Sequence, residues 1–317
     1  MTCEQNIGFD EFCDTIRIAT TSYFKTGPSM GPWGLSWHAL GRIALQFGKD
    51  GSSRIAHGLT HPDATTIFVQ LSRLPDAVYL DGHVAKWHDV AILPPSTHFT
   101  FVSDHQMSWL AIAIPSNLQG EKTARSDFPK ARSLFERKSL VTLAPSSADR
   151  FIEAAEAMKA LLVTPSQNPD AVNVAAAEDE FVGTVDKLLT QHIDAILLPS
   201  EYNESSERII FKALEYVRAR TWEPITVDDL VAVTEVEYRT LLRAFQRFLN
   251  MGPKRYLKLR QLNVVRLALR HAHDDARKVT RILAENGVTE FGRFAIEYKQ
   301  LFGEAPSDTA KHERVSH

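Results

Sequence analysis

Arginine side chains recur at helical spacing in two short stretches near the end of this 317-residue sequence. Arg239 and Arg243 lie four residues apart in the first stretch, and Arg293 is followed three residues later by Ile296 in the second. A guanidinium group can donate two hydrogen bonds to O6 and N7 of guanine, and an apolar side chain can contact a thymine methyl group. The chemistry that these residues could perform is therefore recognition of base edges in duplex DNA.

The later stretch, residues 278–306, has the pattern of a helix-turn-helix, which we call the second unit. The pattern predicts a short helix at Lys278–Glu285, a turn at Gly287, and a longer helix that ends at Gly303 before Pro306. The helical period places one apolar face on the longer helix, made of Phe291, Phe294, Ala295, Tyr298, Leu301 and Phe302. Arg293 and Ile296 then face outward, as on a helix that enters a DNA groove.

The earlier stretch, residues 226–249, repeats this pattern and forms the first unit. It predicts a short helix at Thr226–Val233, a turn, and a second helix at Glu237–Leu249. The inward face of that second helix is made of Leu241, Phe245, Phe248 and Leu249, and its outward face carries Arg239, Arg243, Gln246 and Arg247. A solvated surface is the alternative explanation of these arginines.

Residues Pro253–His271 are predicted to form one helix that joins the two units. Its 19 residues would span about 28 Å, which is close to the roughly 34 Å between successive major-groove faces of B-DNA. This spacing would let one chain place two reading helices on the same side of a duplex. Arg255, Arg266 and Arg270 share one side of the joining helix, where they could contact phosphates.

The segment from Ile209 to Thr309 resembles the C-terminal DNA-binding domain of the arabinose-operon regulator (AraC/XylS) family. The matching words are LLRAFQRFL, MGPKRYLKLRQLNVVRLAL and FGRFAIEYKQLFGEAPSDT. The resemblance implies a bacterial, cytoplasmic and nucleoid-associated regulator that binds double-stranded promoter DNA, and RNA polymerase if it is an activator, which we expect. The sequence departs from the family pattern in and beside the turns, at Glu235, Glu237, Asn250, Leu283 and Val288.

The resemblance also implies roles for individual residues. The expected base-reading set is Arg239, Leu242, Arg243, Arg293 and Ile296. Phe291 and Ala295 also match base-facing positions of the family, but the helical period turns them inward and we leave them out. The expected contacts to the DNA backbone are Thr240, Gln246, Arg247, Lys254, Arg255, Arg266, Arg270 and Thr289. Because the first unit has two arginine readers and the second has one, we expect the first to supply most of the sequence preference.

Charge is distributed unevenly along the chain. Residues 208–317 contain 20 Lys and Arg against 14 Asp and Glu, a net of +6, whereas residues 1–207 contain 16 against 25, a net of −9. A chain of this length has room for two domains. The basic part is the one that would neutralise phosphates, and the acidic part should not touch nucleic acid.

The acidic part is predicted to be rich in strands, which makes the expected fold class α+β. Seven candidate strands alternate polar and apolar residues: Trp37–Phe47, Arg54–Leu59, Thr65–Ser72, Ala77–Leu80, Ala85–Leu93, His98–Val102 and Trp109–Ile114. They favour an antiparallel β-sandwich, and the stretch from Asp81-Gly82 onward resembles a cupin-like sensor domain, which implies a site for an unknown small-molecule effector. The aromatic candidates for that site are Trp37, Trp87, Phe99, Phe101 and Trp109, with core packing as the alternative.

An enzyme is the main competing function class. A cupin metal site would need two histidines one residue apart, and the predicted strand region has no His-x-His pair, so we expect no metal or other cofactor. The sequence also lacks phosphate-cradling glycine motifs, and no catalytic residue is assigned. A cupin-like enzyme, or an interaction protein that has lost specific DNA reading, remain the alternatives.

The segments between these two parts are predicted to be helical. Residues 146–163 and 170–198 have helical periods, and Phe181, Val185, Leu188, His192 and Ile196 form an apolar stripe that would pack on the sandwich or, as we slightly favour, form a homodimer. The expected divisions are a sensing domain at 1–145, a helical extension at 146–198, a linker at 199–207 and a DNA-binding domain at 208–317. The start of the chain does not resemble a signal peptide, and no run reaches the ~20 apolar residues of a membrane span.

Overall fold

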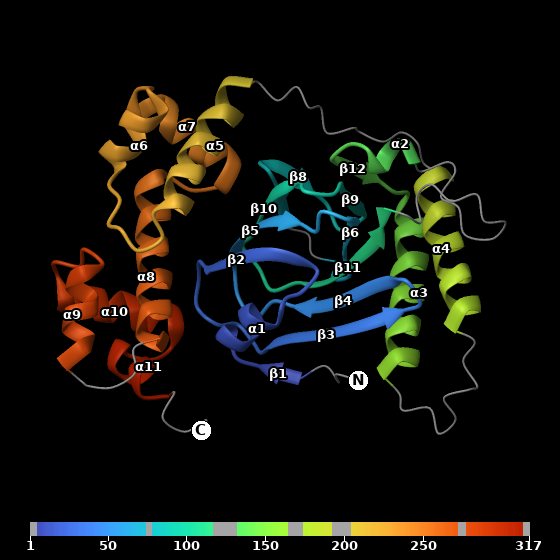
Figure 1. The fold of residues 1–317 in the computed structure, drawn as a ribbon, viewed down its shortest axis with the longest axis horizontal. Coiled ribbons are helices and arrows are strands. Elements are labelled where there is room, and N and C mark those ends of the chain that lie inside the picture. Colours follow the sequence, from blue (N-terminus) through green and yellow to red (C-terminus); the bar gives the residue numbers. More distant parts are fainter. Residues whose placement is uncertain are drawn as a thin grey trace.

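The computed structural model describes residues 5–73, 78–116, 132–163, 174–191, 204–271 and 277–312. Two β-sheets form the N-terminal part, two long helices cover one side of them, and the C-terminal helices lie on the other side (Figure 1). The α+β architecture predicted from the sequence, with a β-rich part followed by a helical part, is confirmed.

The strands form two antiparallel sheets. The larger sheet has the order β1-β3-β4-β11-β6-β9-β12 and the smaller one β2-β5-β10-β7-β8. The strand bounds are β1 Gln5–Ile7, β2 Ala19–Lys25, β3 Trp33–Leu40, β4 Ile43–Lys49, β5 Arg54–Thr60, β6 Ala64–Gln70, β7 Val78–Leu80, β8 His83–Ala85, β9 Asp89–Leu93, β10 His98–Ser103, β11 Ser108–Pro115 and β12 Ser139–Thr142.

The two-residue period of the strands decides which layer each side chain enters. In β11, Trp109 and Ala111 point between the two sheets, whereas Leu110 and Ile112 point toward the helices on the far face. Those helices are α3 (Pro145–Val163) and α4 (Val174–Gln191). The larger sheet is therefore buried on both faces, which explains why its strands read as almost continuous apolar runs.

The strand predictions were wrong in two places. Trp37–Phe47 is not one strand, because Gly41 adopts a left-handed φ of 59° and turns the chain between β3 and β4. Ala85–Leu93 is likewise two strands, since residues 86–88 separate β8 from β9. The strands β1, β2 and β12 were not predicted at all, and Ala77 of another predicted strand lies outside the described residues.

The apolar stripe on α4 packs on the sandwich. Phe181 and Val185 are buried in the core that the larger sheet shares with α3 and α4, and Leu188 packs against it. The preference for a dimer-forming stripe was therefore wrong for these three residues, because the sheet already covers them. His192 and Ile196 lie outside the described residues.

The C-terminal helices follow the predicted order. They are α5 Glu204–Ala219, α6 Val227–Thr234, α7 Tyr238–Leu249, α8 Pro253–His271, α9 Arg277–Glu285, α10 Phe291–Phe302 and α11 Pro306–His312; two short helices, α1 Phe9–Thr15 and α2 Arg132–Phe135, belong to the N-terminal part. Because α5 begins at Glu204, the predicted linker at 199–207 is wrong for residues 204–207, and 199–203 are not among the described residues.

Local interactions fix the turns of both units. Thr226 caps α6, and its side chain and that of Asp229 each accept a hydrogen bond from the other's backbone N–H. At the end of α6, Glu235 takes a left-handed φ of 57°, and Asn250 takes 54° after α7. Gly287 and Gly303 adopt φ values of 72° and 83° after α9 and α10, as their positions predicted.

The smaller sheet connects the two parts of the molecule. One of its faces meets the larger sheet, and its other face, including Ile55 and Val102, joins the apolar core of the C-terminal helices. The layers therefore run from α3 and α4 through the two sheets to the helical domain, with α8 beside β2 (Figure 1). This packing holds both helix-turn-helix units against one support.

Candidate nucleic-acid interface

Helix α7 presents its arginines to solvent. Its buried side holds Leu241, Ala244, Phe245, Phe248 and Leu249, whereas Arg239, Thr240, Arg243, Gln246 and Arg247 are exposed. Arg239 and Arg243 form no ion pair with any residue that the structure describes, so both guanidinium groups can accept a new partner. Leu242 is half-buried, and its Cδ1 atom lies close to Gly252 at the turn before α8.

Helix α10 exposes the predicted readers of the second unit, but in a different electrostatic setting. The side chain of Arg293 is 73% exposed, and Ile296 is 61% exposed. Nε of Arg293 lies 3.1 Å from Oε1 of Glu297, and its Nη1 atom lies 3.7 Å from Oε2 of Glu290. The prediction that Phe291 faces inward was wrong, because it is 37% exposed as the first residue of the helix.

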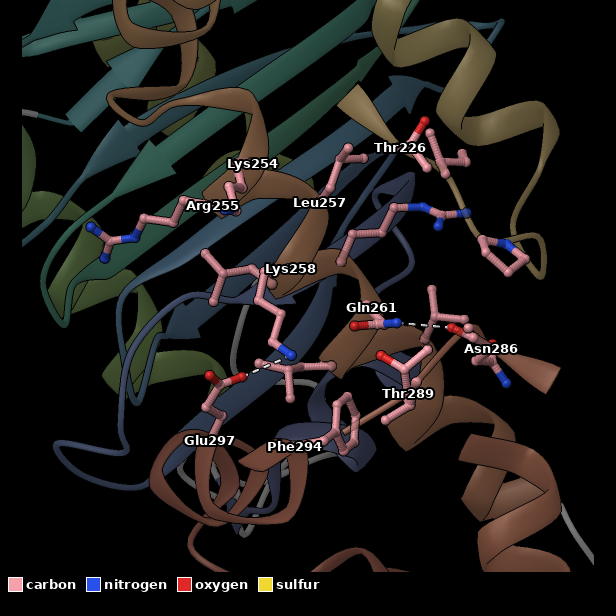
Figure 2. A pocket seen from close by; sticks show the side chains of 18 of the residues that line it. Thr226, Lys254, Arg255, Leu257, Lys258, Gln261, Asn286, Thr289, Phe294 and Glu297 are labelled. Atoms are coloured by element: carbon pink, nitrogen blue, oxygen red, sulfur yellow. Dashed lines mark hydrogen bonds and ion pairs between the residues drawn. The ribbon is translucent and has the colours of Figure 1, made fainter. Parts of the chain in front are cut away.

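A groove of about 940 Å³ lies between the two units (Figure 2). It is lined by the segment before α6, by one side of α8, and by the turn and first residues of α10. Three predicted backbone-contacting residues, Lys254, Arg255 and Thr289, line it and are exposed. The groove is therefore bordered by the second reading helix and by cations of the joining helix.

An ion pair crosses this groove between α8 and α10. Nζ of Lys258 lies 2.8 Å from Oε2 of Glu297 and 5.0 Å from the centre of the Phe294 ring. Partial burial disfavours the charged carboxylate of Glu297, but the hydrogen bonds and charges of Lys258 and Arg293 outweigh it and lower its pKa. Glu297 is therefore ionised at neutral pH.

Two of the predicted backbone contacts have other partners. Nε and Nη2 of Arg266 donate to the carboxylate of Asp10 on α1, at 3.0 and 2.7 Å, and Nη1 donates to Glu304 at 2.8 Å. Nη2 of Arg270 donates to Asp14 of α1 at 2.8 Å. The assignment of both arginines to phosphates is wrong for this conformation, because carboxylates of the N-terminal part occupy them.

Burial and hydrogen bonding act in opposite directions on Arg266. Burial opposes its positive charge, but the hydrogen bond to Asp10 and the charges of Asp10 and Glu304 prevail, so its pKa is raised. Arg266 is therefore positively charged across the physiological range of pH. It fastens α1 to α8, and Glu304 of the second unit binds the same guanidinium group.

Sequence reasoning did not find the other contacts between the two parts. The side chain of Asn263 on α8 accepts from the backbone N–H of Lys25 and donates to its carbonyl, at 3.0 Å each. His57 bonds Thr100 at 2.9 Å and lies 3.4 Å from the hydroxyl of Tyr256. Burial, with a smaller effect from Arg218, lowers the pKa of His57 to about 3, so it is neutral. The opposite net charges of the two parts were a usable signal that they attract.

The predicted effector-site aromatics do not lie together. Phe99, Phe101 and Trp109 are buried between the sheets, where the rings of Phe99 and Phe101 are 5.5 Å apart. Trp37 is 37% exposed on β3, directly opposite Gln46 of β4. Trp87 instead packs against the core beneath α3 and α4, so grouping it with the other four was wrong.

The residues that the structure describes contain no group of three or more His, Cys, Asp or Glu side chains arranged to hold a metal ion. Among the same residues, every helix is too short or too polar to cross a membrane.

Residues 230–312 match the family model described as a helix-turn-helix domain. A probable AraC family transcriptional regulator from Rhodopseudomonas palustris, known as a crystal structure, is 30% identical, with 33% of this chain and 95% of that chain covered and a TM-score of 0.30. This chain is therefore similar, over about a third of its length, to a regulator of the AraC family. An AraC-like transcriptional activator, CuxR, is 13% identical, with 73% of this chain and 80% of that chain covered and a TM-score of 0.38.

The curated relatives match a similar share of the chain. A XylDLEGF operon transcriptional activator of Pseudomonas putida is 30% identical over 112 residues, which are 35% of this chain and 34% of that protein. A probable thc operon regulatory protein of Rhodococcus erythropolis is 36% identical over 100 residues, which are 32% and 30% of the two. The chain thus spans about a third of the length of these relatives.

Proposed function

We propose that this protein is a sequence-specific transcriptional regulator, an activator, that binds promoter DNA through α7 and α10. The observation that carries the proposal is the exposed pair Arg239 and Arg243 on a helix whose opposite side is fully buried. Two guanidinium groups one helical turn apart can reach neighbouring bases in a major groove. The names of the relatives are those of operon regulators, which agrees with this assignment.

The expected DNA contacts fall into two groups. Arg239, Leu242, Arg243, Arg293 and Ile296 would read bases, and Thr240, Gln246, Arg247, Lys254, Arg255 and Thr289 would bind phosphates. All of them are exposed except Leu242, which is half-buried. Base readers supply discrimination between sequences, whereas phosphate contacts supply affinity that salt weakens.

The sandwich would hold the small-molecule effector. Nε2 of Gln46 and Oγ1 of Thr66 are buried without a hydrogen-bond partner among the described residues, and both belong to the strand positions that face the smaller sheet. Buried polar atoms of this kind favour a ligand with polar groups. Trp37 beside Gln46 would report ligand binding through its fluorescence, and the double variant Gln46→Leu with Thr66→Val should lose that response.

Selection of duplexes from a random pool, followed by salt titration, tests the DNA-binding function. Full-length protein should enrich a defined sequence. Its affinity for that duplex and for a scrambled one should fall steeply with salt, and the selected duplex should remain the more tightly bound of the two. Absence of any enriched sequence would support an interaction protein without specific reading. A homodimer or a complex with RNA polymerase would be sought on the selected duplex.

A further inference from the structure

The carboxylate of Glu297 on α10 pairs with two cations beside the groove. The carboxylate of Glu297 lies between Lys258 of α8 and Arg293 of α10, 2.8 Å from Nζ and 3.1 Å from Nε. Figure 2 shows the Lys258 side chain reaching down to Glu297 within the groove. The side chains of Lys258 and Glu297 are 39% and 28% exposed, although the Oε2 atom that joins them is itself buried.

The geometry around Glu297 suits a phosphate group as well as a carboxylate. Two cations from different helices converge on two oxygens of one anion, which is how lysine and arginine commonly hold a phosphate. Lys254 and Arg255 continue the positive charge along α8, and both are exposed and line the same groove. A chain of phosphates could follow this row of side chains.

We propose that the groove between α8 and α10 is a binding site for a phosphate of duplex DNA, and that Glu297 occupies it in the free protein. The proposal rests on the DNA-binding function proposed above. Duplex binding would transfer Lys258 from the carboxylate to the phosphate and release Arg293 to a base edge, so each new contact would replace an existing ion pair. The contact with this phosphate then adds little to the free energy of DNA binding.

Such an internal counter-ion would reduce the amount of protein bound to random DNA, while the ratio of the two affinities stays the same. Random and specific duplexes carry the same phosphates, so the competition by Glu297 weakens binding to both. The complex with a specific duplex still forms, because base contacts contribute additional binding free energy. A random duplex lacks these contacts, so less of it is bound. Glu290, which lies 3.7 Å from Arg293, adds to the same effect at the edge of the groove.

Glu297→Gln tests the proposal, with Glu285→Gln as the matched control. Glu285 also pairs with an arginine four residues away, Arg281 at 2.7 Å, but it does not line the groove. On random-sequence duplex at low salt, we expect Glu297→Gln to bind about 3- to 10-fold more tightly than the wild type, with a salt slope steeper by about 0.9. The control should change affinity by less than about twofold.

Two further measurements test whether the gain in affinity arises from Lys258 and from a phosphate site. Adding Lys258→Gln to Glu297→Gln should remove most of the gain, because the freed cation is then missing. Inorganic phosphate should displace duplex from Glu297→Gln better than chloride at equal ionic strength, because it competes for the same cations; displacement no better than by chloride would overturn the proposal.

The outcomes separate this proposal from the DNA-binding function. If the wild type prefers its selected duplex but Glu297→Gln and Glu285→Gln bind random duplex alike, the phosphate site is refuted and the DNA-binding function stands. If the gain of Glu297→Gln survives the loss of Lys258, the site is refuted as well. If the wild type shows no salt-dependent binding to any duplex, the phosphate site and the DNA-binding function are both refuted.

Discussion

The arginines of the two units differ in what surrounds them. Arg239 and Arg243 are exposed on α7 without an ion pair among the described residues, whereas Arg293 lies beside Glu290 and Glu297. A guanidinium group already paired with carboxylates must give up those pairs before it binds a base. This difference favours the first unit as the main source of sequence preference.

Alanine substitutions should therefore show which of the two units contributes more to the sequence preference. Arg239→Ala should reduce the affinity ratio of selected to scrambled duplex by about 10- to 100-fold, because a two-bonded contact to guanine contributes roughly 1–3 kcal/mol of discrimination. Arg293→Ala should reduce that ratio less, by about 3-fold. Fluorescence anisotropy with both duplexes measures each ratio, and a larger loss for Arg293→Ala would reverse the ranking.

At the scale of elements, the turn between α6 and α7 departs from its ideal residue. Glu235 holds a left-handed φ of 57°, a conformation that a Cβ atom disfavours and that glycine adopts freely. Its side chain compensates only weakly, through an exposed contact with Lys212 at 3.0 Å. The turn therefore keeps its shape at some cost in stability.

Glu235→Gly should raise the midpoint of thermal unfolding by about 3 °C. Glu235→Ala is the control, since it also removes the contact with Lys212 but retains a Cβ atom at the strained position. The difference between the unfolding midpoints of the two variants, measured by calorimetry, reports the cost of the left-handed backbone conformation at residue 235. An alanine variant as stable as the glycine variant would show that the turn is not strained.

The helices of the C-terminal domain could be predicted closely from the sequence. α8 spans Pro253–His271 as predicted, because a proline marks its start and its polar and apolar residues keep one helical period. The strands were harder to predict. β2 is an edge strand with exposed Thr20 and Ser22, so its alternation is weak, and the turn at Gly41 interrupts a pattern that otherwise continues unbroken.

The partners of individual cations could not be predicted. The helical period correctly placed Arg266 and Arg270 on one side of α8, but a carboxylate and a phosphate attract a guanidinium group through the same chemistry. The choice between them depends on α1, whose position follows from Phe12 being buried between Trp33 and Trp109. Such a long-range contact leaves no local pattern in the sequence.

At the scale of the whole molecule, α1 joins the sandwich to the second unit. Phe12 on one side of α1 lies in the core between the sheets, and Asp10 and Asp14 on the other side hold α8. The smaller sheet also touches the first unit, where Nδ2 of Asn250 donates to Asp104 at 2.9 Å. The N-terminal part thus supports both units and sets their relative orientation.

Removing the two carboxylates of α1 should loosen this support. We expect the double variant Asp10→Asn with Asp14→Asn to exchange the amide hydrogens of β2 and of the end of α8 about 10-fold faster, because these segments meet at the interface. Glu11→Gln, an exposed residue of the same helix, is the control. Equal exchange in the two proteins would show that α1 does not fasten the second unit.

The most direct test of the account concerns the two units acting together on one duplex. We expect the selected sequence to contain two boxes about 10 base pairs apart, since the 19 residues of α8 span about 28 Å, close to one turn of DNA. Inserting about five base pairs between the boxes turns one of them to the opposite side of the helix, and the affinity should then fall to that of a duplex with one box. An affinity unchanged by the insertion would show that a single unit reads the DNA and would contradict the account.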